Sequence, residues 1–180
     1  MTQNFNPWHN VEPTTKNSDV VNAIIEIPQN SKAKYELDKN SGLLYLDRIL
    51  SSPMRYPSNY GFVPKTYCDD KDPLDILVIS QVEISPMCIA PAKIVGVMKM
   101  VDNGEGDDKL IAVSAGDPYF KDINDISELP RIMVDSIKVF FEDYKKLENK
   151  TVTIEGVFGK AEAMEILEES YVLYKKEFSK

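Results

Sequence analysis

Short apolar runs separated by polar turns dominate the first two thirds of this chain. Residues 20–27 and 76–79 are rich in β-branched residues and leucine, which is typical of buried strands. Residues 92–101 and 110–113 have the same character. The pattern therefore predicts a strand at each of these four places.

A period of two in the polar and apolar positions marks residues 34–38. A polar turn at 39–42 separates them from residues 43–50, which return as a second strand-like run. This arrangement predicts a β-hairpin. Residues 53–64, which are dense in proline, tyrosine, asparagine and glycine, predict irregular backbone with aromatic anchors.

Helical periodicity is confined to the C-terminal third. Asp125 or Ser127 is a candidate cap of a short turn. The helix that follows has an apolar stripe of Met133, Ile137, Phe140, Phe141 and Tyr144. Residues 151–158 alternate as a strand, and a last amphipathic helix follows Gly159. The whole pattern predicts a β-rich α+β fold with roughly six to eight strands and two appended helices.

Length and composition favour an ordinary globular protein. The 180 residues are most simply one domain, residues 1–180, and 43% of them are hydrophobic. Residues 1–19 are mostly polar and predict an extended arm, in which Trp8 packs on the body of the protein or contacts a partner. No stretch is apolar enough to span a membrane, and the N-terminus lacks a signal-peptide pattern. We therefore expect a cytoplasmic protein.

Charge and residue usage exclude several kinds of site. Lys and Arg number 21 against 29 Asp and Glu, a net charge of −8, which disfavours nucleic-acid binding because that needs a basic face. The single histidine, His9, lies in the N-terminal arm, which argues against a histidine triad or a zinc site. Cys68 and Cys88 lack metal-ligand spacing, and we expect both to be reduced thiols.

An acidic loop immediately precedes the apolar run 76–79. Asp69, Asp70, Asp72 and Asp75 fall within seven residues, and Pro73 stiffens the backbone between them. Crowded carboxylates take up protons, are solvated apart or share cations, and Mg²⁺ is the natural partner for such oxygen ligands. The loop alone leaves a solvated acidic turn and a metal site equally open, while its spacing does not fit a calcium-binding loop.

A second acidic loop, residues 102–109, leads straight into the run 110–113. An Asp- and Gly-rich turn is ordinarily only a turn. If the strands that follow the two loops are neighbours, however, the loops converge on one cation cluster.

Other charged residues lie within the predicted strands. Glu26 stands inside an apolar run, where an acid needs a partner or a metal, or else faces solvent at a sheet edge. Lys34 and Glu36 share one face of the hairpin, and their simplest interpretation is an ion pair on a wet surface. The pattern does not decide between these alternatives.

Taken together, seven blocks of the sequence resemble the soluble family I inorganic pyrophosphatases, in the order and spacing of that family. The resemblance covers about residues 20–160. The blocks are Ile25-Glu26-Ile27-Pro28, Lys34-Tyr35-Glu36, Leu46-Asp47-Arg48, Tyr56-Pro57-Ser58-Asn59-Tyr60-Gly61, Asp70-Lys71-Asp72-Pro73-Leu74-Asp75, residues 102–109 and residues 140–145.

The resemblance implies a closed five-stranded β-barrel of the oligonucleotide-binding type with flanking helices. It also implies Mg²⁺-dependent hydrolysis of pyrophosphate to two phosphates at the barrel mouth, in a homo-oligomer that is hexameric in bacterial relatives. Two Mg²⁺ ions lower the pKa of a shared water, and metals with Lys and Arg neutralise the anionic substrate. In-line displacement also needs the leaving phosphate to be stabilised.

The same resemblance assigns roles position by position. Asp72 matches the acid that takes the proton from the attacking water. Tyr56 matches a supporting position, and Glu26 and Glu36 match second-shell or additional metal acids. The metal ligands would be Asp70, Asp75 and Asp107, with Asp102 completing a further site. The leaving phosphate would be held by Lys34, Arg48, Tyr60, Tyr144 and Lys145, and the attacked one by Lys109.

Three features depart from the family pattern. Lys71 stands where a small or acidic residue is usual, and its charge either swings into solvent or weakens metal binding. Val139 and Asp143 replace histidines that many bacterial members use in subunit contacts. Residues 114–120 match no familiar pattern. A non-catalytic metal- or nucleotide-binding protein with this fold is the alternative function, but the complete set of site residues argues against it.

Overall fold

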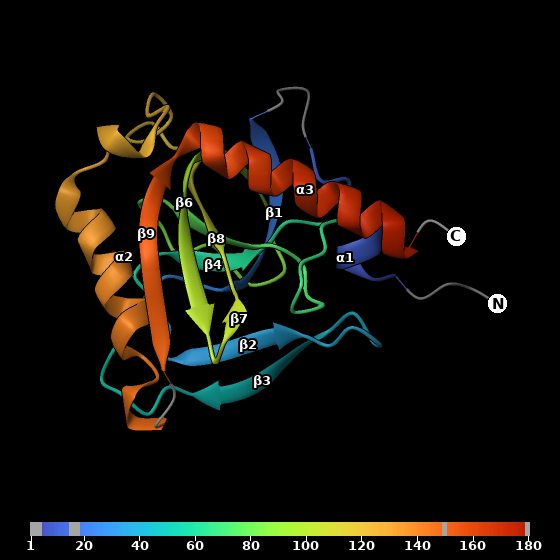
Figure 1. Ribbon diagram of the computed structural model, residues 1–180, viewed down its shortest axis with the longest axis horizontal. Coiled ribbons are helices and arrows are strands. Elements are labelled where there is room, and N and C mark those ends of the chain that lie inside the picture. Colours follow the sequence, from blue (N-terminus) through green and yellow to red (C-terminus); the bar gives the residue numbers. More distant parts are fainter. Residues whose placement is uncertain (1–4, 15–18, 149–150, 179–180) are drawn as a thin grey trace.

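The structure, a computed structural model, describes residues 5–14, 19–148 and 151–178. Five strands form a closed ring, because the last strand in the order pairs with the first (Figure 1). In order around the ring these strands are β1 (Val20–Ile27), β4 (Asn59–Phe62), β5 (Asp75–Ile79), β8 (Lys109–Ser114) and β6 (Ile89–Asp102).

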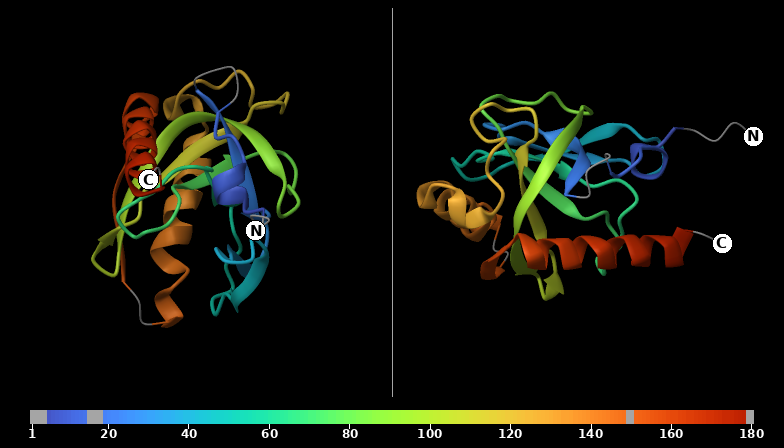
Figure 2. Two further views of the ribbon diagram at one scale, coloured as in Figure 1. Left: turned by 90° about the vertical axis from the view of Figure 1, so that its right-hand side faces the viewer. Right: turned by 90° about the horizontal axis from the view of Figure 1, so that it is seen from above.

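The remaining elements extend this ring or flank it. The hairpin of β2 (Ala33–Leu37) and β3 (Leu44–Ile49) forms a separate two-stranded sheet, as the sequence predicts. The strands β7 (Glu105–Gly106) and β9 (Val152–Gly159) pair with β6. In Figures 1 and 2, helix α2 (Arg131–Asp143) lies beside β9, and α3 (Lys160–Phe178) crosses β6. Short 3₁₀ turns occupy Ile126–Glu128 and Lys146–Glu148, and the first of them has Asp125 as its cap. The α+β class is confirmed.

Strand β5 is buried on both faces, which explains its uninterrupted apolar sequence. Successive side chains of a strand point to opposite faces. Leu77 and Ile79 accordingly join the hydrophobic cluster that α2 covers, and Ile76 and Val78 join the cluster that includes residues of α3. All four side chains are at most 3% exposed.

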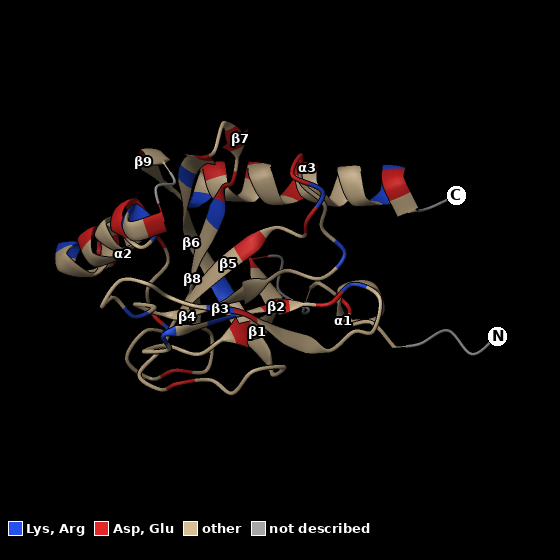
Figure 3. Ribbon diagram, turned by 90° about the horizontal axis from the view of Figure 1, so that it is seen from below, with Lys and Arg blue, Asp and Glu red and all other residues tan. Residues whose placement is uncertain are grey.

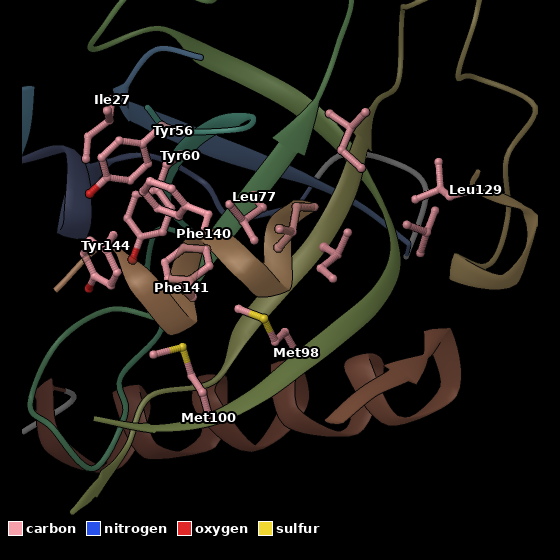
Figure 4. Packing of buried hydrophobic residues seen from close by; sticks show 14 of the residues in the cluster. Ile27, Tyr56, Tyr60, Leu77, Met98, Met100, Leu129, Phe140, Phe141 and Tyr144 are labelled. Carbon is pink, nitrogen blue, oxygen red and sulfur yellow. The ribbon is translucent and has the colours of Figure 1, made fainter. Parts of the chain in front are cut away.

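The hydrophobic cluster beneath α2 is largely aromatic around the C-terminal end of this helix (Figure 4). Phe140 lies 4.8 Å from Tyr56 and 5.0 Å from Phe141, measured between ring centroids, and Phe141 lies 6.1 Å from Tyr60. Such offset and edge-on ring pairs add to the stability given by area burial. The apolar stripe predicted for this helix therefore packs α2 on Tyr56 and Tyr60.

The irregular segment predicted at 53–64 is partly wrong, because β4 lies inside it. Proline, glycine and asparagine hide the strand pattern, yet Gly61 is required here by close approach. A Cβ atom at this position would lie 1.8 Å from the carbonyl oxygen of Ile24 on β1. The glycine lets the two backbones pair at this point of the ring.

The extended N-terminal arm predicted at residues 1–19 is wrong where a short helix interrupts it. Pro7–Asn10 forms the short helix α1, which Asn6 caps by accepting a hydrogen bond from the Trp8 N–H. Asn before Pro is a helix-start signal, because proline suits the first helical position. Trp8 is 3% exposed and packs on the protein body. Residues 1–4 and 15–18 lie outside the described residues.

The segment 114–120, which had no recognisable pattern, is organised by Asp117. Its carboxylate accepts hydrogen bonds from the backbone N–H of Gln81 at 2.8 Å, the Gln81 side-chain amide at 2.7 Å and the Ser80 hydroxyl at 3.1 Å. Asp117 thus ties the turn after β8 to the end of its neighbour β5. Cys68 and Cys88 are both free thiols, as predicted. Within the described ranges, no helix has both the length and the apolar character needed to cross a membrane.

Candidate active site

The two acidic loops converge because the strands that follow them are neighbours. β5 and β8 pair in parallel, with Asp75 opposite Lys109 in register. Parallel strands present their starting ends at the same edge, so the loops ending at these two residues meet there. This confirms the convergence that the sequence left conditional. In Figure 3, acidic and basic positions of β1, β2, β5 and β8 gather in the same part of the molecule.

Lys109 is the centre of this convergence. Its side chain is 2% exposed, and its Nζ donates to Asp75 Oδ2 at 2.7 Å, to Asp107 Oδ1 at 2.8 Å and to the Tyr60 hydroxyl at 3.1 Å. The Tyr60 hydroxyl also donates to Asp75. A buried ammonium is tolerated only when such partners compensate its lost hydration.

The buried charges shift one another's pKa. Burial opposes the charge of Lys109, but Asp75 and Asp107 outweigh it and raise the pKa of this ammonium well above its ordinary value. Burial likewise opposes ionisation of Asp107, yet Lys109 holds the pKa of this carboxyl below its ordinary value. Burial keeps the pKa of Asp75 raised against the pull of Lys109. The two carboxylates therefore favour the charged form of Lys109.

Glu26 and Asp70 form no comparable ion pair with a lysine among the described residues. Burial, reinforced by Asp75, raises the pKa of Glu26 to about 8, although the Leu37 N–H donates to its carboxylate at 2.8 Å. Glu26 is 8% exposed, so the solvent-facing interpretation is wrong and its partner is the backbone of the hairpin. Burial and Asp107 raise the pKa of Asp70 to about 6. Both positions would hold a negative charge better with a cation nearby.

A cavity of about 480 Å³ opens beside this cluster. Every candidate residue from the sequence except Arg48 and Tyr56 lines it. These residues are Glu26, Lys34, Glu36, Tyr60, Asp70, Asp72, Asp75, Asp102, Asp107, Lys109, Tyr144 and Lys145.

The hairpin forms one wall of the cavity. Lys34 forms ion pairs with Glu36 and, at 3.2 Å, with Asp47 of β3. The Tyr45 hydroxyl, which sequence reasoning missed, donates to Glu36. The pairing register of the hairpin could have identified Tyr45, because this residue lies directly opposite Glu36. The pair Lys34–Glu36 is therefore a cavity feature and not simply a wet surface pair.

Arg48 and Tyr56 do not line the cavity. Arg48 contacts Asp47 through Nη1 at 2.8 Å and Glu148 through Nε at 3.3 Å. Its Nε and Nη2 are buried without a hydrogen-bond partner. Tyr56 is 2% exposed and packs in the aromatic cluster against Tyr60. Sequence reasoning missed Glu148, which lies in a short turn without a recognisable motif.

The second loop is anchored from the end of α2. Lys145 is buried and forms an ion pair with Asp102 Oδ2, while Asp102 Oδ1 is buried without a hydrogen-bond partner. Tyr144 packs on Phe140 with a centroid distance of 5.1 Å. A buried carboxylate oxygen without a donor is costly in a folded protein, and a cation ligand role would satisfy it.

The donor set fits a hard cation by chemistry and charge. The cavity lining contains eight carboxylates and four lysines, a formal excess of four negative charges when all are ionised. Within the described residues, however, no three His, Cys, Asp or Glu side chains are arranged to hold a metal ion. Asp75, Asp107 and Asp102 turn toward lysine ammonium groups instead. Oxygen ligands of this kind suit Mg²⁺, which binds through one or two carboxylates and retains several waters.

Comparisons with known proteins show which family the chain resembles. The family model described as inorganic pyrophosphatase matches residues 23–175. The chain is 51% identical to soluble inorganic pyrophosphatase 2 of Chlamydomonas reinhardtii over 96% of this chain and 90% of that protein.

Solved structures give the same result. The inorganic pyrophosphatase of Thermus thermophilus has a TM-score of 0.90 and 35% identity, covering 94% of this chain and 99% of that one. The enzyme of Helicobacter pylori has a TM-score of 0.87 and 41% identity, covering 93% and 99%. The chain belongs to the inorganic pyrophosphatase family.

Proposed function

We propose that this protein hydrolyses inorganic pyrophosphate to two phosphates with Mg²⁺ as the cofactor. Family membership makes it an inorganic diphosphatase of a generally metal-dependent family. The observation that carries the proposal is that Asp70, Asp72, Asp75 and Lys109 line one acidic cavity together. A cavity with excess negative charge would repel the pyrophosphate anion. Pyrophosphate would therefore bind there only together with cations.

The metal would be held by Asp70, Asp75 and Asp107, with Asp102 completing a further site. Bound there, Mg²⁺ would neutralise the anionic substrate and acidify a bound water. The buried Asp102 oxygen without a donor and the raised pKa values of Asp70 and Asp75 support this assignment.

Asp72 would act as the general base. It lines the cavity, and its side chain is 49% exposed, so water has access to the carboxylate. Its backbone N–H donates to Asp70 Oδ1 at 3.0 Å, which fixes the loop that carries it. Accepting the proton of the attacking water at this carboxylate fits the in-line displacement of phosphoryl transfer.

The cations and tyrosines would bind the two phosphates. Lys109 would contact the attacked phosphate, and the carboxylates of Asp75 and Asp107 favour its charged form by raising the pKa of its ammonium well above the ordinary value. A residue that stays charged can stabilise a developing negative charge without reorganisation. Glu26, Glu36 and Tyr56 would support the site. The leaving phosphate would be held by Lys34, Arg48, Tyr60, Tyr144 and Lys145.

The five-stranded ring would be the closed barrel of the oligonucleotide-binding type, and residues 1–180 would act as one cytoplasmic pyrophosphatase domain. Nucleic acid would not bind, given the net charge of −8. A homo-oligomer, most simply a hexamer, is supported by the exposed apolar side chains of Ile132 and Val139 on α2.

Substrate comparison tests this function. Phosphate release is measured at fixed Mg²⁺ with pyrophosphate, with ATP and with a phosphomonoester, each with a chelator control. We expect rapid release from pyrophosphate and little from the other two. Equal rates for all three substrates, or no release from folded protein, would contradict the proposal.

A further inference from the structure

The turn of the β2–β3 hairpin places Lys39 in the cavity wall beside Asp72. The Lys39 ammonium forms an ion pair with the Asp72 carboxylate and lies 5.6 Å from the centroid of the Trp8 ring. Trp8, Lys39 and Asp72 all line the cavity. Lys39 therefore links an aromatic ring of the N-terminal helix to the proposed general base.

Lys39 differs from the other lysines of the cavity in its exposure. Its side chain is 47% exposed, compared with 19% for Lys34, 10% for Lys145 and 2% for Lys109. The other three are enclosed by their surroundings. A long and largely exposed side chain keeps one position only if neighbouring groups hold it there.

The N-terminal segment, residues 6–11, supplies this support. Asn6 Nδ2 donates to the backbone carbonyl of Lys39 at 2.7 Å, and Asn6 Oδ1 accepts from the Trp8 N–H at 2.9 Å. The Trp8 indole N–H donates to the carbonyl of Thr66 at 2.8 Å. The backbone of Lys39 and the ring beneath its ammonium are thus fixed through the same residue, Asn6.

Residues of the C-terminal helix α3 also contact Trp8 and its neighbour His9. The Trp8 ring stacks on His9 with a centroid distance of 4.6 Å and meets Phe178 edge-on at 5.4 Å. A hydrogen bond of 2.7 Å joins His9 Nδ1 to the hydroxyl of Tyr174 on α3. Figures 1 and 2 show α1 beside the C-terminal end of α3. Both ends of the chain therefore build the support beneath Lys39.

This arrangement is poorly suited to stabilise the fold, because exposed ion pairs and exposed cation–π contacts contribute little. It is well suited to hold a carboxylate in one orientation. We propose that Lys39 is a positioning residue for Asp72, and that Trp8 and the N-terminal segment keep Lys39 in place. The proposal rests on the proposed function, in which Asp72 accepts the proton of the attacking water.

Steady-state kinetics test the catalytic side of this inference. Lys39→Met keeps an unbranched apolar side chain and removes the ammonium. We expect kcat for pyrophosphate to fall about tenfold with KM changed less than about twofold, since misplacing a reacting group mainly slows the chemical step. Lys39→Arg should restore most of the lost kcat, because it restores the charge.

Lys65→Met is the matched control. Lys65 pairs with Glu12 at 2.6 Å and so ties the same end of the chain, but it does not line the cavity. We expect its kcat and KM to equal those of the parent. Equal losses of kcat in Lys39→Met and Lys65→Met, with matching losses of thermal stability, would make the role structural and overturn the proposal.

Fluorescence gives a readout that needs neither metal nor substrate, because Trp8 is the single tryptophan of the chain. In chelator, Lys39→Met and Asp72→Asn should each shift the Trp8 emission. Asp72→Asn should add no further shift in the Lys39→Met background, which is the signature of a coupled pair. Asp69→Asn, an exposed acid on the same loop, should leave the emission unchanged.

The two measurements separate the possible failures. An active parent with normal kcat in Lys39→Met overturns the positioning role. Independent and additive emission shifts for Lys39→Met and Asp72→Asn overturn the link through Lys39. A parent that releases no phosphate from pyrophosphate contradicts the proposed function, and the fluorescence cycle alone then decides whether Lys39 connects Trp8 to Asp72.

Discussion

Asp75 and Lys109 occupy paired positions at the first residues of the parallel strands β5 and β8, and their side chains meet in an ion pair of 2.7 Å. Among the described strands this is the only parallel pairing. It brings two acidic loops that are distant in sequence to one edge of the ring. The position of the site is therefore a consequence of strand order.

Lys109→Met should destabilise the metal-free protein strongly. The substitution leaves the partly buried carboxylates of Asp75 and Asp107 without their shared cation, and removing one partner of a buried ion pair costs about 3–5 kcal/mol. Urea unfolding in the presence of a chelator measures the loss. Lys99→Met removes the partly exposed pair with Glu162 and should cause a far smaller change. Similar losses for both variants would contradict the central role of Lys109.

Asp72→Asn should lower kcat by about a hundredfold or more, the scale of lost general-base catalysis. Because Asp72 is not among the proposed metal ligands, the Mg²⁺ concentration that gives half-maximal rate should stay close to that of the parent. The pH–rate profile is the decisive measurement. A profile identical to that of the parent would remove Asp72 from this role.

Asp117→Asn should lower the free energy of unfolding by about 1–2 kcal/mol near neutral pH, because hydrogen bonds to a charged acceptor are lost. Burial opposes the charge of Asp117, but donors led by the Gln81 N–H lower the pKa of its carboxyl below the ordinary value. Its contribution is therefore complete above about pH 4 and is lost as the pH falls through the lowered folded-state pKa.

Thermal unfolding of this variant and the parent across pH measures the effect. The difference between them should shrink below about pH 4, where the parent also loses the charged acceptor. A difference that stays constant through this range would show that the ionised carboxylate is not what ties the two turns together.

Lys71→Gly should stabilise the acidic loop. Lys71 has φ of +68°, a left-handed conformation that costs a residue with a side chain roughly 1 kcal/mol and glycine almost nothing. Equilibrium unfolding should show a gain of up to about 1 kcal/mol, reduced by the greater backbone entropy of glycine in the unfolded chain. Lys71→Ala is the control and should show no gain. A gain of equal size in both variants would point to the charge of Lys71 instead of its backbone.

Periodicity and residue type predicted most of the fold. The unbroken run at residues 76–79 identified β5, and the alternation around Glu36 identified the hairpin. β4 was missed because Tyr60-Gly61-Phe62 lies among prolines, and its identity depends on Gly61 meeting the backbone of Ile24. Such a close approach between distant segments has no local signal.

The sequence predicted the site residues that belong to local motifs. Five carboxylates from the two acidic loops line one cavity together with Lys109, as the sequence suggested. Lys39 and Glu148 were missed because their partners, Trp8 and Arg48, are remote in sequence and bring no characteristic spacing. The helical conformation of α1 had a local signal, Asn6 before Pro7, that the polar composition of this region obscured.

The central claim is that the acidic cavity works only when cations complete it. The most direct test titrates Mg²⁺ and follows phosphate release from pyrophosphate by the parent and by Asp75→Ala. We predict no release in chelator, a saturable rise with Mg²⁺ for the parent, and a curve for Asp75→Ala displaced to higher Mg²⁺. Release in chelator, or identical curves for the two proteins, would contradict the claim.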